Sequence, residues 1–79
     1  MVTARELLIT YEIRKEGYER GLIKYGRPLY DAVCVLVRRL AELPVDELVR
    51  IDDQDGHAVF VVARTGAPIA QMSTGVARR

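Results

Sequence analysis

The chain has 79 residues, a net charge of +1 and 49% hydrophobic residues. This length allows one small domain, and the charge argues against strong nonspecific binding to nucleic acid. A domain of this size buries only about 60–65% of its unfolded surface and usually depends on disulfides, a metal or a partner subunit. The single cysteine excludes an internal disulfide, and no Cys and His cluster indicates zinc. We therefore expect self-association, with a homodimer favoured, and no cofactor.

The N-terminal residues lack the basic and apolar regions of a secretory signal. No segment approaches the ~18 uninterrupted apolar residues that a membrane-spanning helix needs. We therefore expect a cytoplasmic protein that does not span a membrane.

A capping box predicts the start of the first helix. In Thr3-Ala-Arg-Glu6 the Thr3 hydroxyl would accept from the Glu6 N–H, and the Glu6 carboxylate would accept from the Thr3 N–H. Val2 and Leu7 stand at the two positions of a hydrophobic staple. A seam with spacings of four and three follows, in which only Lys15 is polar. Its apolar members are Ala4, Leu8, Tyr11, Tyr18, Leu22 and Tyr25.

Residues 5–16 also fit a strand, because apolar residues alternate with polar ones from Leu7 to Arg14. Gly17 weakens a long helix by about 1 kcal/mol relative to Ala. The capping box and the length of the seam favour helix, and strand stays the alternative. A break at Gly17 is compatible with both.

Gly26 suits the left-handed conformation that ends a helix, and Pro28 suits the first turn of the next. We expect this second helix over residues 28–43, where Pro44 ends it. Its apolar residues form two adjacent stripes: Leu29, Val33, Leu36, Leu40 and Leu43, and beside them Tyr30, Cys34, Val37 and Ala41. So wide an apolar face predicts a helix that is central to the core and touches a second subunit.

Two β-rich segments, residues 48–53 and 57–64, flank Asp55-Gly56, which is typical of a type I′ turn. This turn sets a register with three notable pairs: Gln54 with His57, Ile51 with Phe60, and Val49 with Val62. The last two pairs share an apolar face that should pack on the helices. The other face mixes Leu48, Val59, Val61 and Ala63 with Arg50 and Asp52, which indicates that it too is covered, by self-association.

A third strand over residues 67–72 is expected after Thr65-Gly66, with Pro68 placing it at the sheet edge. The predicted fold is α+β in two layers: a helical hairpin packed on a three-stranded antiparallel meander, in the order ααβββ. Residues 1–72 would form one domain, and residues 73–79 a flexible tail.

The sequence predicts no catalytic or metal site. Asp53 and His57 would project to opposite faces of the hairpin, so they cannot share a metal. Cys34 falls within an apolar stripe, whereas a catalytic thiol needs an accessible, electropositive setting. We therefore expect a protein that is not an enzyme.

A basic, tyrosine-rich stretch gives the alternative function. Tyr11, Tyr18 and Tyr25 recur every seven residues, and cations are interleaved with them. Rings among cations can stack on bases while the cations hold phosphates, although a helix–helix core produces the same spacing. The possible nucleic-acid contacts are Arg14, Lys15, Arg20, Lys24, Arg27, Tyr18 and Tyr25.

The leading hypothesis is a small interaction or regulatory module that acts through self-association and protein–protein contacts. It rests on the small size, the broad apolar second helix, the partly apolar outer sheet face and the lack of a catalytic set. The expected interface residues are Tyr30, Cys34, Val37, Val59 and Val61.

Overall fold

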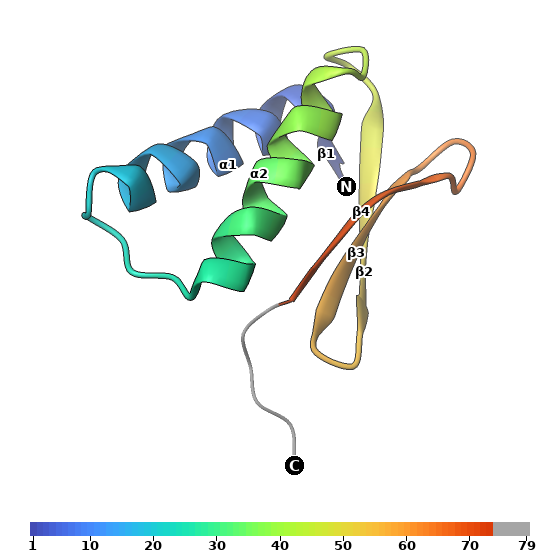
Figure 1. The fold of residues 1–79 in the computed structure, drawn as a ribbon. Coiled ribbons are helices and arrows are strands. Elements are labelled where there is room, and N and C mark those ends of the chain that lie inside the picture. The colour runs from blue at the N-terminus through green and yellow to red at the C-terminus, as the bar shows by residue number, and fades with distance from the viewer. Residues whose placement is uncertain (74–79) are drawn as a thin grey trace.

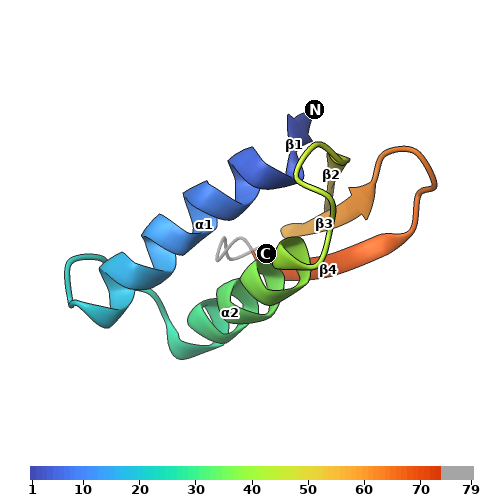
Figure 2. The same ribbon diagram turned by 90° about the horizontal axis from the view of Figure 1, so that it is seen from above.

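Six elements follow one another in the computed structural model, which describes residues 1–73. They are β1 (Val2–Thr3), α1 (Ala4–Glu19), α2 (Arg27–Ala41), β2 (Leu48–Gln54), β3 (His57–Val62) and β4 (Pro68–Ser73). The strands form one antiparallel sheet in the order β1-β2-β3-β4. Both helices lie on the same side of this sheet (Figures 1 and 2). The predicted α+β fold, with a helical hairpin packed on an antiparallel sheet, is confirmed.

The N-terminus of α1 is held by the expected capping box. The Glu6 N–H donates to Thr3 Oγ1 at 3.2 Å, and the Thr3 N–H donates to Glu6 Oε1 at 3.1 Å. The strand alternative for residues 5–16 is therefore wrong. The reason is that the helix buries Ala4 and Leu7, whereas a strand would have to bury Ile9 and Ile13, which are exposed.

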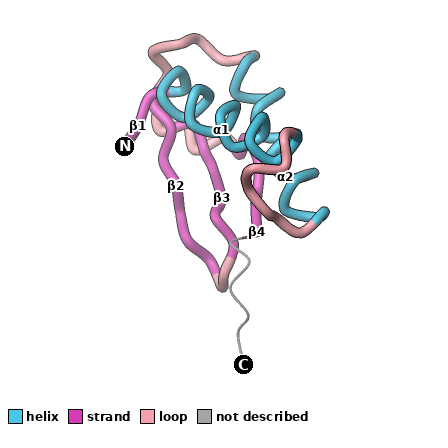
Figure 3. Tube along the Cα trace, turned by 90° about the vertical axis from the view of Figure 1, so that its left-hand side faces the viewer, coloured by secondary structure: helices cyan, strands magenta, loops and turns pink. Residues whose placement is uncertain are grey.

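Strand β1 is a feature that the sequence did not predict. Val2 pairs with Val49 and Thr3 with Leu48, and the Ala4 N–H donates to the Glu47 carbonyl at 2.8 Å. Two residues are too few to show an alternating pattern. The sheet therefore has four strands, and β1 adds to only the first part of β2 (Figure 3).

The connection between the helices differs from the prediction. Helix α1 passes Gly17 without a break and ends at Glu19, so Leu22 is 73% exposed instead of continuing the seam. The chain folds back over Gly17, where a Cβ would lie 2.7 Å from Ile23 Cδ1. The left-handed residue is Gly21, with a φ of 76°, and not Gly26, whose φ is −71°. Gly26 is instead the extended N-cap of α2.

Helix α2 is central to the core, as the sequence predicts. It has Pro28 in its first turn and ends at Ala41, two residues before the expected limit at Leu43. It packs on α1 and on β4. The buried residues of its first stripe, each at most 1% exposed, are Val33, Leu36 and Leu40.

The β2–β3 hairpin has the predicted turn and register. Asp55 and Gly56 both have positive φ, as a type I′ turn requires, and the three predicted cross-strand pairs are all present. Phe60 is fully buried, with the Tyr11 ring edge-on to it at 6.0 Å. Ile51 is 46% exposed, however, so the helix-facing side of the sheet is not covered along its whole length. Helix α2 packs on β4, two strands away from β2, and α1 reaches β3 through the contact of Tyr11 with Phe60.

The last strand, β4, is an edge strand, as Pro68 indicates. Gly66 in the turn before it has a φ of 73°. The pairing with β3 shifts between Phe60 and Val61, and Ile69 is buried in the core. Ser73, expected in the tail, is the last residue of β4, and the rest of that predicted tail lies outside the described residues.

The two glycines of the interhelical connection should respond differently to the same substitution. Gly21→Ser places a Cβ on a left-handed backbone and should lower the free energy of unfolding by about 1–2 kcal/mol. Gly26→Ser is the matched control, because its extended N-cap backbone suits serine, and it should leave stability unchanged or raise it by a few tenths of a kcal/mol. Urea unfolding measures both. Equal losses would contradict this assignment of the turn.

Candidate binding surfaces

The sheet has one face without helices, which we call the outer face. Its residues alternate with those of the core: Arg50 lies opposite Val61, and Asp52 lies opposite Val59. Leu48 and Ala63 belong to the same face, since the Ala63 N–H donates to the Leu48 carbonyl at 2.9 Å. Both helices are on the other side (Figures 1 and 2). The outer face is thus a strand surface that no other layer covers in residues 1–73.

The outer face is apolar at its centre and electrically balanced. Leu48 is 46% exposed, Val59 and Ala63 are half-buried, and Val61 is 6% exposed without joining the main core. Arg50 Nε donates to Asp52 Oδ1 at 3.1 Å, so the cation and the anion neutralise each other. Such a surface ion pair adds little stability, about 0–1 kcal/mol. The outer face therefore carries no excess charge whose burial against an apolar partner would cost desolvation free energy.

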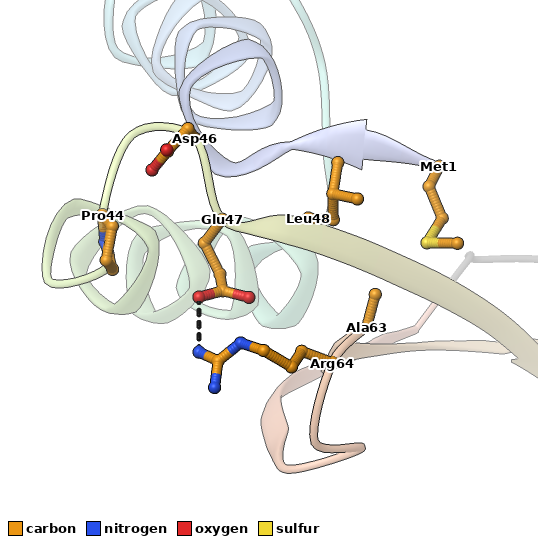
Figure 4. A pocket seen from close by; sticks show the side chains of 7 residues that line it. All are labelled: Met1, Pro44, Asp46, Glu47, Leu48, Ala63 and Arg64. Carbon is orange, nitrogen blue, oxygen red and sulfur yellow. Dashed lines mark hydrogen bonds and ion pairs between the residues drawn. The ribbon is translucent and has the colours of Figure 1, made fainter.

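A pocket of about 530 Å³ opens at one end of the outer face (Figure 4). Leu48 and Ala63 contribute apolar surface to it, and Glu47 and Arg64 are joined by an ion pair of 2.9 Å. The Glu47 side chain is only 10% exposed. This pair was missed by sequence reasoning because it joins residues on two different loops 17 positions apart. The remaining lining residues are Met1, Pro44 and Asp46.

The five expected interface residues do not form one surface. Val59 and Val61 lie on the outer face, but the other three belong to α2, in the helical layer. The Tyr30 ring stacks on Tyr18 at 4.3 Å, and Val37 packs against the core. Cys34 is half-buried on the same helix. Tyr30 and Val37 thus contribute to packing within the fold, and contact of any of the five residues with a partner stays a prediction.

The tyrosines of the basic stretch stack on one another. Tyr18 lies 4.3 Å from Tyr30 and 5.5 Å from Tyr25, measured between ring centroids, with interplanar angles of 26° and 9°. Stacking on a base needs an open ring face, and Tyr18 already has a tyrosine ring stacked on it from α2 and another from the connection. Tyr11, the third member of the seven-residue spacing, packs instead on Phe60 of β3.

Most cations of the same stretch have a carboxylate partner on the same helix. Lys15 pairs with Glu19 at 3.2 Å, Arg20 with Glu16 at 3.3 Å and Arg27 with Asp31 at 3.1 Å. Arg14 lies over the Tyr11 ring at 5.7 Å, and Lys24 is exposed. The positive potential of this stretch is thus locally compensated.

A second pocket, of about 230 Å³, lies between the helical layer and β3 and β4. Two of its residues have unusual surroundings. The Tyr25 hydroxyl is buried and has no hydrogen-bond partner, and Arg14 makes no ion pair in the part of the chain described. The other lining residues are Tyr11, Leu29, Val33, Ala58 and Met72.

The residues considered for a metal site, Asp53 and His57, do not lie together. Asp53 pairs with Ala58 and Gln54 with His57, so Asp53 and His57 face opposite sides of the sheet. Within residues 1–73, no three His, Cys, Asp or Glu side chains are grouped so that they could hold a metal ion. Neither helix is long and apolar enough to cross a membrane.

Comparison of the chain with protein-family models, curated proteins and solved structures finds no match. A functional proposal therefore depends on the surfaces of this chain alone.

A hydrogen bond between Tyr30 and Glu19 joins the two helices. The Tyr30 hydroxyl donates to Glu19 Oε2 at 2.5 Å. This bond, and then the neighbouring Cys34 thiol, raise the pKa of Tyr30 well above its usual value. The same bond, together with Lys15, lowers the pKa of Glu19. The neutral phenol and the ionised carboxylate are therefore the forms that the folded state favours.

Tyr30→Phe should reduce the dependence of stability on alkaline pH. A raised tyrosine pKa contributes stability that is complete below about pH 10, the pKa of an unfolded tyrosine, and that is lost as pH rises through the folded value. The variant lacks this contribution, so it should be less stable than wild type at neutral pH and lose less above about pH 10.

Urea unfolding at several pH values measures this difference. Tyr11→Phe is the control at neutral pH, because the Tyr11 hydroxyl makes no hydrogen bond in the described chain, and its stability there should match wild type. Parallel pH curves for wild type and Tyr30→Phe would show that the Glu19 bond does not form in solution.

Proposed function

We propose that the protein is a non-enzymatic interaction module that acts by self-association, with its outer face packed on the outer face of a second copy. The observation that carries the proposal is the apolar, charge-balanced outer face, over which no helix lies. Sheets that pack face to face need such a surface, with side chains of both inner faces in contact.

A second copy fits this face better than a charged partner does. Two-fold symmetry brings the same patch together from both subunits, so a patch with excess charge would repel itself. The outer face instead holds Arg50 and Asp52, one of each sign, joined by an ion pair. A two-fold axis can place Arg50 of one copy beside the partner's Asp52, which adds favourable contacts without leaving a buried charge unpaired.

The size of the chain supports the same proposal. With 79 residues and one cysteine, no internal disulfide stabilises the fold. Each apolar Å² removed from water contributes about 25 cal/mol, and the 46% of Leu48 that is exposed, together with half-buried Val59 and Ala63, is available for this. Self-association through the outer face would thus supply the burial that a small two-layer fold lacks.

Leu48→Glu should disrupt the oligomer without unfolding the subunit. The side chain is 46% exposed, so the new carboxylate stays in water in the monomer but would be buried between two copies. Leu22→Glu is the matched control, because Leu22 is exposed on the connection between the helices, away from the sheet. Val61 is less suitable, since a charge at a position only 6% exposed would damage the fold itself.

Size exclusion with light scattering measures the mass of wild type and both variants. Wild type and Leu22→Glu should be dimers, and Leu48→Glu should be a monomer with an unchanged circular dichroism spectrum. A monomeric wild type across the concentration range, or a Leu48→Glu dimer, would contradict the proposal.

Nucleic-acid binding through residues 14–27 is the weaker proposal. Only Arg14 and Lys24 of its five cations lack a carboxylate partner in the described structure, and the tyrosines stack on one another. Binding of this kind should weaken steeply as salt rises. Fluorescence anisotropy with labelled single-stranded DNA and RNA at low salt tests it. The absence of binding there would eliminate this function.

A further inference from the structure

The second pocket, between the helical layer and β3 and β4, has the features of a ligand site. It has a volume of about 230 Å³ and is enclosed by residues from α1, α2, β3, β4 and the connection between the helices. Its apolar lining comes from Leu29, Val33, Ala58 and Met72. Sites for small molecules are typically apolar pockets of this kind, in which a few polar groups converge and fix the orientation of the ligand.

The first polar group is the Tyr25 hydroxyl. It is buried, and it has no hydrogen-bond partner among residues 1–73. Most buried polar side-chain atoms in proteins have a partner, because an unpaired one costs free energy. Tyr25 also lines the pocket. A ligand oxygen within the pocket would give this hydroxyl the acceptor that the described residues do not supply.

The second polar group is the Arg14 guanidinium. It lines the same pocket and lies over the Tyr11 ring at 5.7 Å, but no carboxylate of the described residues pairs with it. Its neighbours on the helix differ in this respect, since Lys15 and Arg20 are both in ion pairs. A guanidinium offers several N–H donors in a geometry that matches a carboxylate.

We propose that this pocket binds a small monocarboxylic acid with an apolar body, such as an aromatic or branched-chain acid. The carboxylate accepts from the Arg14 guanidinium and from the Tyr25 hydroxyl. The apolar body lies among Leu29, Val33, Ala58 and Met72. This site lies between the helical layer and the sheet and not on the outer face, so it does not depend on the proposed self-association.

Other classes of small molecule fit the pocket less well. A cationic ligand would be repelled by Arg14. An inorganic anion would pair with Arg14 but leave the apolar lining unfilled. A neutral molecule of similar shape could pair with Tyr25 but would leave the guanidinium without a counter-ion. A monocarboxylate with an apolar body would pair with Arg14, accept from the Tyr25 hydroxyl and fill the apolar lining.

Benzoate and phenylacetate are suitable probes, and benzamide and phenylacetamide are their neutral counterparts. Each is titrated into the full chain at neutral pH, into the millimolar range because ligands this small bind weakly. Binding is followed by amide chemical shifts in ¹H–¹⁵N spectra. The two acids should shift the backbone amide signals of Tyr25, Leu29, Val33 and Met72. Benzamide and phenylacetamide should bind at least about tenfold more weakly than the acids, as expected when a charge-assisted hydrogen bond is lost.

Two variants and a matched control assign the polar contacts. Arg14→Met keeps the apolar stem, and Tyr25→Phe keeps the ring; each should weaken the binding of the acids by about tenfold or more. Lys24→Met removes a nearby exposed cation that does not line the pocket, and it should bind as wild type does. Tyr25→Phe removes an unpaired buried hydroxyl, so it should be at least as stable as wild type.

Three outcomes would overturn the proposal. Failure of the wild-type protein to bind either acid would exclude the site. Equal affinity for the acids and for benzamide and phenylacetamide would exclude pairing of Arg14 with the carboxylate. Shifts confined to residues around Leu48 and Ala63 would place the ligand in the pocket of the outer face instead.

Discussion

Burial of the apolar stripe of α2 is the interaction on which the rest of the structure depends. Val33, Leu36 and Leu40 are at most 1% exposed, and α2 is the element that packs on both α1 and β4. Helix α1 shares this core, since its Ala4, Leu7 and Tyr11 pack in the same cluster as Val49 and Phe60 of the sheet. If the α2 stripe were polar, α2 would lose its apolar contact with both of its neighbours. The helical layer packs on one side of the sheet, and the outer face remains open.

Local patterns that involve neighbouring residues could be predicted from the sequence. The capping box, the type I′ turn and its register, the edge position of Pro68 and the central role of α2 all depend on short-range chemistry or on simple periodicity. The seam of α1 could not be followed to its end. Its spacing continues past Glu19, but the fold-back at Gly21 and the fit of Ile23 over Gly17 are decided by tertiary packing.

The candidate binding surfaces could be predicted only in part, because they combine residues from distant segments of the sequence. The alternating pattern of β2 and β3 correctly placed Val59 and Val61 together on the face away from the helices. The pattern of α2 could not show that Tyr30 stacks on Tyr18, because that contact joins two separate helices. The pocket at Arg14 and Tyr25 has no sequence signal, since it is formed by five segments, and its unpaired hydroxyl can be recognised only in three dimensions.

Isotope-filtered NOE spectroscopy shows whether the open outer face contacts the same face of a second copy. A sample mixed from labelled and unlabelled protein reports only contacts between subunits. We expect NOEs between subunits from the methyl groups of Leu48, Val59 and Ala63, which share the outer face. Intermolecular NOEs that come instead from the exposed side chains of α1, Ile9 and Ile13, or no such NOEs at concentrations used for NMR, would contradict it.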